Sequence, residues 1–267
     1  MAQANDRLAQ AFLRYAAPLG RLRRIPIVGR CLSWAAAAVV PRRSLTWVQV
    51  QRGPAAGIWL RLNPRTGHDA LQGATEPDVQ DALQQHLRPG MTFYDIGANI
   101  GFLSLLAARL VGKHGRVIAF EADPEIASRL REHVERNGFS WATVEEKAAW
   151  SASRRILFAR TDPKASPDRG LGHVVNSASA DTMEIDAVSL DDFVRNFGAA
   201  PDFIKCDVEG AEVEVFRGAQ RLLAEKRPGI LCEIHSEENR RALLDEFVCL
   251  GYACKNCGDR HLLALHQ

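Results

Sequence analysis

Residues 91–250 alternate short apolar runs with longer amphipathic stretches, and this alternation limits the folds open to the chain more than any other feature. The short runs are typical of buried strands, and the longer stretches have helical periodicity. Strands joined by helices pair in parallel through right-handed crossovers. We therefore predict a doubly wound, Rossmann-like α/β domain: a mostly parallel, seven-stranded sheet with helices on both faces. The predicted strands are 91–96, 116–120, 143–148, 154–160, 183–188, 203–207 and 229–235, followed by one or two edge strands in the tail. The predicted helices are 100–111, 124–137, 190–197, 212–226 and 237–250.

Composition divides the chain into three parts. Residues 1–43 carry eight Arg, no Lys and one acid, a local net charge of +7 in a chain whose total is +2. We expect this part to be a basic, apolar helical arm, because its apolar side chains recur at near-helical spacing. Residues 44–90 are predicted to hold a β-hairpin and then a helix, capped by Thr75 or Asp78, that leads into the core. Residues 91–267 form the α/β domain.

The arm leaves two interpretations open. In one, it packs on the domain or on a second subunit, and in the second case the protein is a homodimer. In the other, it lies on anionic lipid as an interfacial helix and gives the protein peripheral membrane contact. The sequence has no run of about 18 apolar residues that would span a bilayer, and its start does not read as a secretory signal. Six Cys residues without a paired framework favour a reducing compartment, so we expect a cytoplasmic location.

Net charge and cysteine spacing limit the kinds of ligand and partner that we expect the protein to bind. Of the 34 basic and 32 acidic residues, 26 and 31 lie outside the arm, which leaves the rest of the chain with a net charge of −5. That balance, without a stripe of basic and aromatic residues, predicts no nucleic-acid partner. Cys254 and Cys257 have zinc-ligand spacing, but one such pair is weak evidence for a zinc site.

The first strand of the domain ends in a turn that contains Asp95, Gly97, Asn99 and Gly101. Glycines let the backbone approach a ligand closely, and the helix that follows offers unpaired N–H groups. A dinucleotide site would carry three glycines spaced G-x-G-x-x-G. The Asp95 carboxylate is unfavourable beside a diphosphate and favourable beside a cationic ammonium or sulfonium. The second strand ends at Glu121, which suits a bidentate hydrogen bond to two ribose hydroxyls.

Five runs of the sequence resemble the FkbM family of methyltransferases. They are Asp95-Ile96-Gly97-Ala98-Asn99-Ile100-Gly101-Phe102, Gly115-Arg116-Val117-Ile118-Ala119-Phe120-Glu121, Ser189-Leu190-Asp191-Asp192-Phe193, Phe203-Ile204-Lys205-Cys206-Asp207-Val208-Glu209-Gly210-Ala211-Glu212 and Arg227-Pro228-Gly229-Ile230-Leu231-Cys232-Glu233-Ile234-His235. The resemblance covers about residues 76–235, and the Lys-x-Asp-Val-Glu-Gly run is its most distinctive part. It implies a domain, residues 91–267, that binds S-adenosylmethionine. It also implies O-methylation of a hydroxyl on a sugar or natural product, so that the partner is a small-molecule or glycan acceptor.

The resemblance also implies which positions bind the cofactor. Ala148, after the third strand, is expected to contact adenine through its backbone. Glu76 matches an acid that the family carries upstream of the glycine turn, near the methionine end, although a helix-start Glu explains it equally well. The full predicted set is Asp95, Gly97, Asn99, Gly101, Glu121, Ala148 and Glu76.

The strand that ends at Asp207 places Lys205 and Asp207 on one face. A lysine inside a central parallel sheet needs a charged partner, and its natural partners here are Asp207, Glu209 and Glu233. Either this network only holds the sheet together, or these groups line the methyl-acceptor pocket, which is the interpretation that we favour.

His235 shares a strand face with Glu233, and both can meet Asp207 across the cleft. A hydroxyl acceptor needs a proton acceptor near neutrality, and His235 is the best candidate. The predicted catalytic set is His235, Asp207, Lys205, Glu209 and Glu233. Alternatively, Asp207, Glu209 and His235 hold a divalent metal ion that acidifies the hydroxyl, a choice that spacing does not decide.

Two other functions stay open at this point. A nicotinamide oxidoreductase on the same fold would carry G-x-G-x-x-G, which is absent from the turn at residues 97–101. A catalytically silent, cofactor-binding assembly subunit would keep the glycine turn alone. The presence of Lys205, Asp207, Glu209 and His235 argues against such a subunit.

Overall fold

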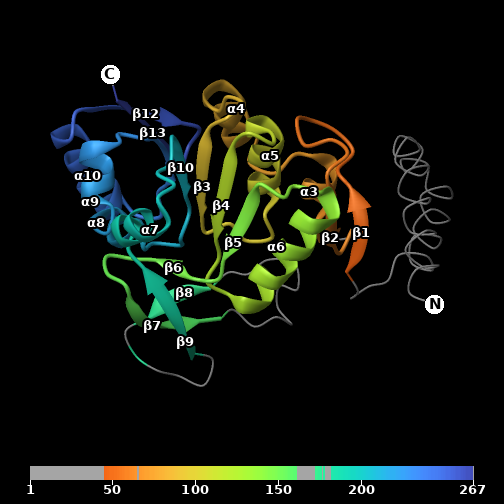
Figure 1. Ribbon diagram of the computed structural model, residues 1–267, viewed down its shortest axis with the longest axis horizontal. Helices are drawn as coiled ribbons and strands as arrows, with labels where there is room; N and C mark the ends of the chain where they lie inside the picture. Colours follow the sequence, from red (N-terminus) through yellow and green to blue (C-terminus); the bar gives the residue numbers. More distant parts are fainter. Residues whose placement is uncertain (1–44, 65, 161–171, 176, 178–181, 267) are drawn as a thin grey trace, which may run out of the picture. The chain divides into compact units, whose positions relative to one another are not determined.

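A seven-stranded sheet forms the centre of the α/β domain, with strand order β12-β13-β11-β10-β3-β4-β5 (Figure 1). The five strands from β11 to β5 are parallel, and the tail adds β13 and β12 as antiparallel strands at one edge. This sheet confirms the predicted fold class. The strands are β3 (Thr92–Ile96), β4 (Arg116–Phe120), β5 (Ala142–Glu145), β10 (Phe203–Cys206), β11 (Gly229–Glu233), β12 (Tyr252–Cys257) and β13 (His261–His266).

The computed structural model describes residues 45–64, 66–160, 172–175, 177 and 182–266. The chain divides into two compact units, one up to Ala74 and one formed by Thr75–Gln267. The predicted helical arm, residues 1–43, and most of residues 161–181, between two predicted strands, lie outside the described residues. None of the helices in the described ranges is long and apolar enough to cross a membrane.

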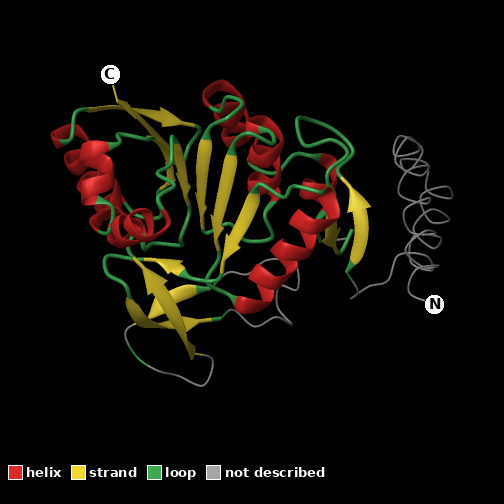
Figure 2. Cartoon of the chain, viewed as in Figure 1, coloured by secondary structure: helices red, strands yellow, loops and turns green. Residues whose placement is uncertain are grey.

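Helices cover both faces of the sheet (Figure 2). One face carries α4 (Pro77–His86), α5 (Phe102–Val111) and α6 (Pro124–Asn137), and the other carries α7 (Leu190–Phe197), α8 (Glu212–Arg217), α9 (Gln220–Glu225) and α10 (Glu237–Cys249). Local sequence explains the bounds of α6. The Asp123 side chain accepts hydrogen bonds from two backbone N–H groups of the first turn, Pro124 fits that turn, and Gly138 ends the helix at φ 69°.

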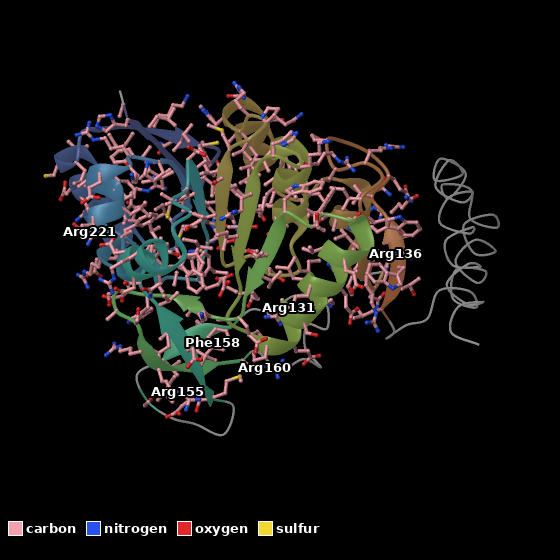
Figure 3. All side chains as sticks on the ribbon, in the orientation of Figure 1. Arg131, Arg136, Arg155, Phe158, Arg160 and Arg221 are labelled. Carbon is pink, nitrogen blue, oxygen red and sulfur yellow. The ribbon has the colours of Figure 1, made fainter. Side chains whose placement is uncertain are left out.

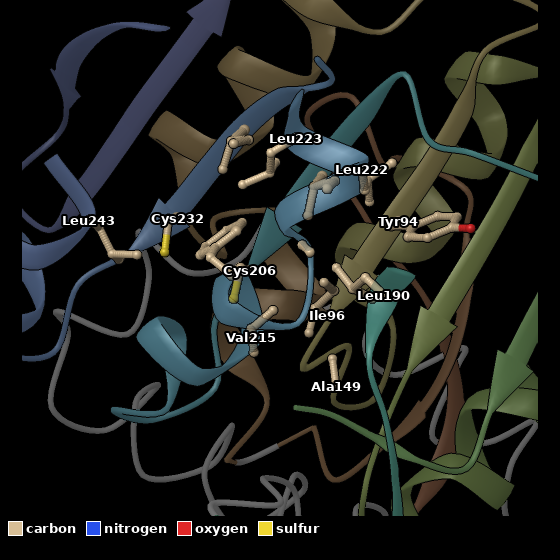
Figure 4. Close-up of a cluster of buried hydrophobic side chains, with 14 of the residues drawn as sticks. Tyr94, Ile96, Ala149, Leu190, Cys206, Val215, Leu222, Leu223, Cys232 and Leu243 are labelled. Carbon is tan, nitrogen blue, oxygen red and sulfur yellow. The ribbon is translucent and has the colours of Figure 1, made fainter. Parts of the chain in front are cut away.

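An aromatic cluster lies between the sheet and α7. The rings of Tyr94 and Phe120, on neighbouring strands, meet edge to face at 5.5 Å, and Phe193 packs against both at 5.8 and 4.9 Å. Alternation along the strands directs Ile204 and Cys206 to the same side of the sheet. Figure 4 shows Tyr94 with Cys206 and other members of this buried cluster. The opposite side of β10 therefore carries Lys205, whose charge needs other partners.

A second sheet, of order β6-β9-β7-β8, follows β5 along the chain. Its strands are β6 (Ala148–Ala149), β7 (Arg154–Ala159), β8 (His173–Val175) and β9 (Thr182–Val188). The predicted strand 143–148 is therefore wrong at its end: β5 stops at Glu145, and Ala148 pairs with Ala187 of β9 in the second sheet. Figure 3 labels Arg155 and Phe158 on this sheet.

Two further helix predictions need correction. The predicted helix 212–226 is divided into α8 and α9 because the chain turns at Gly218, where a side chain would place its Cβ 2.1 Å from the Trp150 carbonyl oxygen. Neither Thr75 nor Asp78 caps α4. Glu76 is the N-cap residue, in a left-handed conformation with φ 44° and without a side-chain cap hydrogen bond.

The smaller unit contains the predicted hairpin. Strands β1 (Thr46–Gln49) and β2 (Trp59–Leu62) pair in antiparallel fashion, and a short helix, α3 (His68–Gln72), follows them. The alternating burial of the two strands buries Val48, Leu60 and Leu62 on one side. Helix α3 was not predicted from the sequence.

The aromatic cluster gives a stability prediction. Phe193 is 1% exposed, and Phe193→Ala is expected to lower the free energy of unfolding by about 3–5 kcal/mol, because the packed rings leave a cavity that the sheet cannot close. Urea unfolding followed by circular dichroism measures the change. Val248→Ala, at a side chain 60% exposed on α10, is the control, with a change within about 0.5 kcal/mol. Equal losses for the two variants would contradict this account.

Candidate active site

The turn between β3 and α5 contains two glycines, and at each of them a different neighbour excludes a side chain. Gly97 has φ 75°, and a Cβ there would lie 1.8 Å from the backbone oxygen of Asp207, where the chain leaves β10. Gly101 has φ 85°, and a Cβ there would lie 1.9 Å from Leu130 of α6. Gly97 thus lets two chain segments pass closely at the carboxyl edge of the sheet, and Gly101 lets α6 pack against the turn.

Glu121, at the end of β4, is held by the same turn. It is 8% exposed, and its carboxylate accepts hydrogen bonds from the backbone N–H of Asn99 at 2.7 Å and of Asp123 at 2.9 Å. Burial raises the pKa of Glu121 to about 7, although both hydrogen bonds favour the charged form. Each carboxylate oxygen keeps a further lone pair, so the group can accept two more hydrogen bonds from a ligand.

A cleft of about 660 Å³, measured with the space open to solvent, lies beside this turn. The glycine turn and the ends of β4 and β10 form one wall, and the second sheet forms the other. The lining residues include Gly97, Asn99, Glu121, Ala148, Trp150, Phe158, His173, Asp207, Val208 and Glu209. The structure thus brings the predicted positions 97, 99, 121 and 148 to one cleft together with two predicted catalytic residues, and it adds aromatic and His side chains of the second sheet that the sequence did not indicate.

Asp95 is directed behind the cleft. Its carboxylate is fully buried, accepts a hydrogen bond from the Ser104 hydroxyl and lies 3.8 Å from the Lys205 ammonium. Burial raises the pKa of Asp95, against the pull of Lys205. Asp95 is absent from the residues that line the cleft, and its expected role in cofactor binding stays a prediction.

Lys205 bridges two strands. Its ammonium lies 3.3 Å from Asp207 and 3.8 Å from Asp95, the residue beside it on β3. The predicted partner Asp207 is confirmed. Glu209 and Glu233 are not its ion-pair partners, because both carboxylates turn toward a histidine instead. Burial disfavours the charge of Lys205, but the two aspartates outweigh it and raise its pKa, and Lys205 in turn lowers the pKa of Asp207.

His235 lies just beyond β11, surrounded by carboxylates. Its Nδ1 is 2.6 Å from Glu212, and its Nε2 is 3.4 Å from Glu209, 3.7 Å from Asp207 and 3.8 Å from Glu233. The hydrogen bond with Glu212 raises the pKa of His235. The structure therefore joins the predicted residues His235, Asp207, Glu209 and Glu233, and it adds Glu212.

Glu212 belongs to the candidate site and was missed by sequence reasoning. Its carboxylate is buried and accepts hydrogen bonds from the Gly210 N–H at 2.9 Å and the Asn239 side chain at 2.7 Å, besides its contact with His235. The residue closes the distinctive run at 203–212, so the sequence contained a signal, but nothing in the spacing showed that it reaches His235.

The predicted metal group differs in one member. The potential ligand atoms of Asp207, Glu233 and His235 lie within 4.8 Å of one another, whereas Glu209 is outside that group and its side chain is 43% exposed. Burial, and then Asp207, raises the pKa of Glu233 to about 7. Glu233 also pairs with Arg260 at 2.9 Å.

Glu76 does not reach the described cleft. Its carboxylate lies 3.8 Å from His261 of β13, and His261 is 3.6 Å from Glu233. Burial lowers the pKa of His261 to about 4. The expected place of Glu76 near the methionine end stays a prediction.

Comparison with known proteins identifies the family. The profile of the methyltransferase FkbM domain matches residues 95–260, more than half of the chain. The chain belongs to the FkbM family of methyltransferases. The predicted family is thus confirmed, and S-adenosylmethionine is the cofactor that comes with it.

Curated methyltransferases match parts of this chain. Hexuronic acid methyltransferase AglP of Haloferax volcanii is 28% identical over 162 residues, which are 60% of this chain and 63% of AglP. Protein-L-isoaspartate O-methyltransferase of Aeropyrum pernix is 40% identical over 70 residues, 26% of this chain and 27% of that protein. The matched segments therefore cover less than two thirds of each relative.

One solved structure supports the fold. Methyltransferase FkbM from Methylobacillus flagellatus KT superposes with a TM-score of 0.50 at 20% sequence identity, over 75% of this chain and 54% of that one. Its likeness bears on the architecture of the sheet and helices alone.

The cleft fits S-adenosylmethionine on its own chemistry. Gly97 and Asn99 line the cleft, and the Glu121 carboxylate offers lone pairs for two ribose hydroxyls. The carboxylates of Asp207 and Glu209 face the same cleft and favour a positively charged group.

Glu121 gives a prediction for cofactor affinity. Glu121→Gln is expected to weaken binding of S-adenosylhomocysteine at least about tenfold, because each lost charge-assisted hydrogen bond is worth roughly 1.5–3 kcal/mol. Since the pKa of Glu121 is raised to about 7, the carboxylate forms as pH rises, and wild-type affinity should increase from about pH 6 to about pH 8. Calorimetry at both pH values measures this.

The control is Glu125→Gln, an exposed acid in the first turn of α6. It should keep wild-type affinity and the same pH dependence. A Glu121→Gln protein that binds as tightly as wild type would contradict the assignment of Glu121 to the ribose.

Proposed function

We propose that this FkbM-family protein transfers the methyl group of S-adenosylmethionine to a hydroxyl of a sugar or related natural product. The observation that carries the proposal is His235, which is hydrogen-bonded to buried Glu212 on one ring nitrogen and directed toward Asp207 and Glu209 with the other. A hydroxyl must lose its proton during methylation, and a carboxylate-oriented imidazole is a group that accepts one.

The bound cofactor supplies an electrophilic methyl group on a positively charged sulfur. The protein then has to position the acceptor hydroxyl in line and remove its proton, and positioning alone supplies up to roughly 7–11 kcal/mol of the barrier. Asp207 lines the cleft, and Lys205 fixes it as a carboxylate, so Asp207 is suited to accept a hydrogen bond from the acceptor. His235 takes the proton at Nε2.

Glu212 decides which nitrogen of His235 is available. Its carboxylate accepts a hydrogen bond from Nδ1–H, and the bonds from Gly210 and Asn239 hold that carboxylate in place. The neutral imidazole then keeps the lone pair of Nε2 free for a proton. After transfer, the same carboxylate stabilises the imidazolium.

The proposal of a sugar acceptor is supported by the chemistry of the site and by one relative. Two or three hydrogen-bonding carboxylates around one base suit a molecule with several hydroxyl groups, such as a sugar. AglP, named a hexuronic acid methyltransferase, matches 60% of this chain. We therefore place sugars and hexuronic acids first in a panel of acceptors.

Turnover of this panel tests the function. Wild-type protein should release S-adenosylhomocysteine with at least one acceptor, and His235→Ala should lower kcat by about 10²–10⁴-fold, the usual contribution of a general base. Affinity for S-adenosylhomocysteine should stay at the wild-type value. Full turnover by His235→Ala would contradict a base role, and wild-type binding without turnover on any acceptor would favour a silent cofactor-binding subunit.

Glu212→Gln tests the orientation of the imidazole. The amide can donate to Nδ1 and force the proton of the neutral ring onto Nε2, so kcat should fall by roughly the same 10²–10⁴-fold while KM for S-adenosylmethionine is unchanged. Glu214→Gln is the matched control: this acid of the same helix is partly buried, pairs with Arg217 and accepts a hydrogen bond from Ser151, and the variant should keep wild-type kcat. A Glu212→Gln variant with full kcat would show that Glu212 only packs the core.

A further inference from the structure

A second histidine meets two carboxylates behind the catalytic group. Glu76 precedes α4, Glu233 ends β11, and His261 begins β13 directly beside Glu233 in the antiparallel register. The Nε2 atom of His261 lies 3.6 Å from Glu233 and 3.8 Å from Glu76, and the three potential ligand atoms lie within 4.8 Å of one another. We call these residues the Glu76 trio. Their atoms are slightly too far apart for direct hydrogen bonds and close enough to share one small ion.

The imidazole of His261 points to a ligand at this place. Its Nε2 atom is buried and makes no hydrogen bond with any residue in the described ranges. A buried polar nitrogen of this kind is costly unless a water or an ion completes it. The ring faces two carboxylates across less than 4 Å, so a cation between the three groups would satisfy all of them.

In the neighbouring trio of Asp207, Glu233 and His235, each side chain already has a close partner. Lys205 pairs with Asp207 at 3.3 Å, and Arg260 pairs with Glu233 through one oxygen, Oε1, at 2.9 Å. His235 itself is bonded to Glu212. The other oxygen of Glu233, Oε2, faces His261. An ion therefore fits better on the His261 side of Glu233 than on the His235 side.

We propose that the Glu76 trio binds one divalent first-row metal ion, such as Mn²⁺, Fe²⁺ or Zn²⁺. One imidazole nitrogen with two carboxylates is a donor set that these ions accept, and three protein ligands leave coordination positions open. Through Glu233, the ion would act on the charge of the group around His235, which the proposed function assigns to catalysis. That last role rests on the proposed function, whereas the binding of the ion does not.

Binding of Mn²⁺ to the full-length protein tests the site. Electron paramagnetic resonance of free Mn²⁺, in protein first treated with a chelator and dialysed, should show one bound ion for each chain. His261→Ala should weaken binding by about 100-fold or more, since loss of even an outer-shell partner of a metal site costs about 10–100-fold in affinity. Binding of S-adenosylhomocysteine by His261→Ala confirms that this variant still folds.

Two controls separate the alternatives. His235→Ala removes the histidine of the neighbouring trio and should keep Mn²⁺ affinity, as should His114→Ala at an exposed turn. If His235→Ala loses the ion and His261→Ala keeps it, the ion binds at the catalytic group and the proposal is wrong. If S-adenosylmethionine displaces Mn²⁺ competitively, the trio holds the methionine ammonium instead, and the proposal is also wrong. Because no methyl transfer is measured, these outcomes are independent of the proposed function.

Discussion

Lys205 carries a positive charge inside the central sheet, and two carboxylates on either side compensate it. Its ammonium is 3.8 Å from Asp95 on β3 and 3.3 Å from Asp207 just past β10, while the lysine is only 3% exposed. Removing one partner of such a buried group typically costs about 3–5 kcal/mol, because an uncompensated charge is left behind. Asp95 and Asp207 therefore keep fixed positions relative to each other at neighbouring strand ends: the glycine turn begins after Asp95, and Asp207 begins the segment that lines the same wall of the cleft.

Backbone contacts hold the same two segments together. The N–H of Asp207 donates to the carbonyl of Ile96 at 2.9 Å, and its own carbonyl passes Gly97 so closely that any side chain there would collide with it. The ion pairs of Lys205 and this close approach thus both join the ends of the neighbouring strands β3 and β10. Under the proposed function, the sheet itself would place a cofactor at the turn and an acceptor at Asp207 relative to each other, as in-line transfer needs.

The sequence predicted those parts of the molecule whose signals are local. The alternation of strands and helices depends on neighbours along the chain, so β3, β4, α6 and α7 appear close to their predicted bounds. Breaks set by distant contacts were missed: Gly218 divides a predicted helix because the Trp150 carbonyl lies against it. The pairing of Ala148 with the second sheet likewise depends on β9, some forty residues later in the chain.

The site residues also divide into those with a local sequence signal and those placed by distant contacts. Positions in the glycine turn and Glu121 follow strands that the pattern locates, so topology alone brings Gly97, Asn99 and Glu121 to one edge. Glu212 was missed because a helix residue faces His235 only once α8 has packed. His261 was missed because the sequence of the tail strand β13 does not by itself determine its register against β11. That register places His261 beside Glu233.

The two histidines show how similar surroundings lead to different chemistry. Both lie near Glu233, which is shared through different oxygens: Oε1 faces His235 and Oε2 faces His261. For His235, a short hydrogen bond to Glu212 fixes the ring, raises its pKa and leaves the second nitrogen for a proton. His261 has two carboxylates opposite one nitrogen at distances too long for hydrogen bonds. The His235 ring is therefore suited to bind a proton, and the His261 ring is suited to bind an ion with a larger radius. Glu233 would connect them, so that filling one site changes the field at the other.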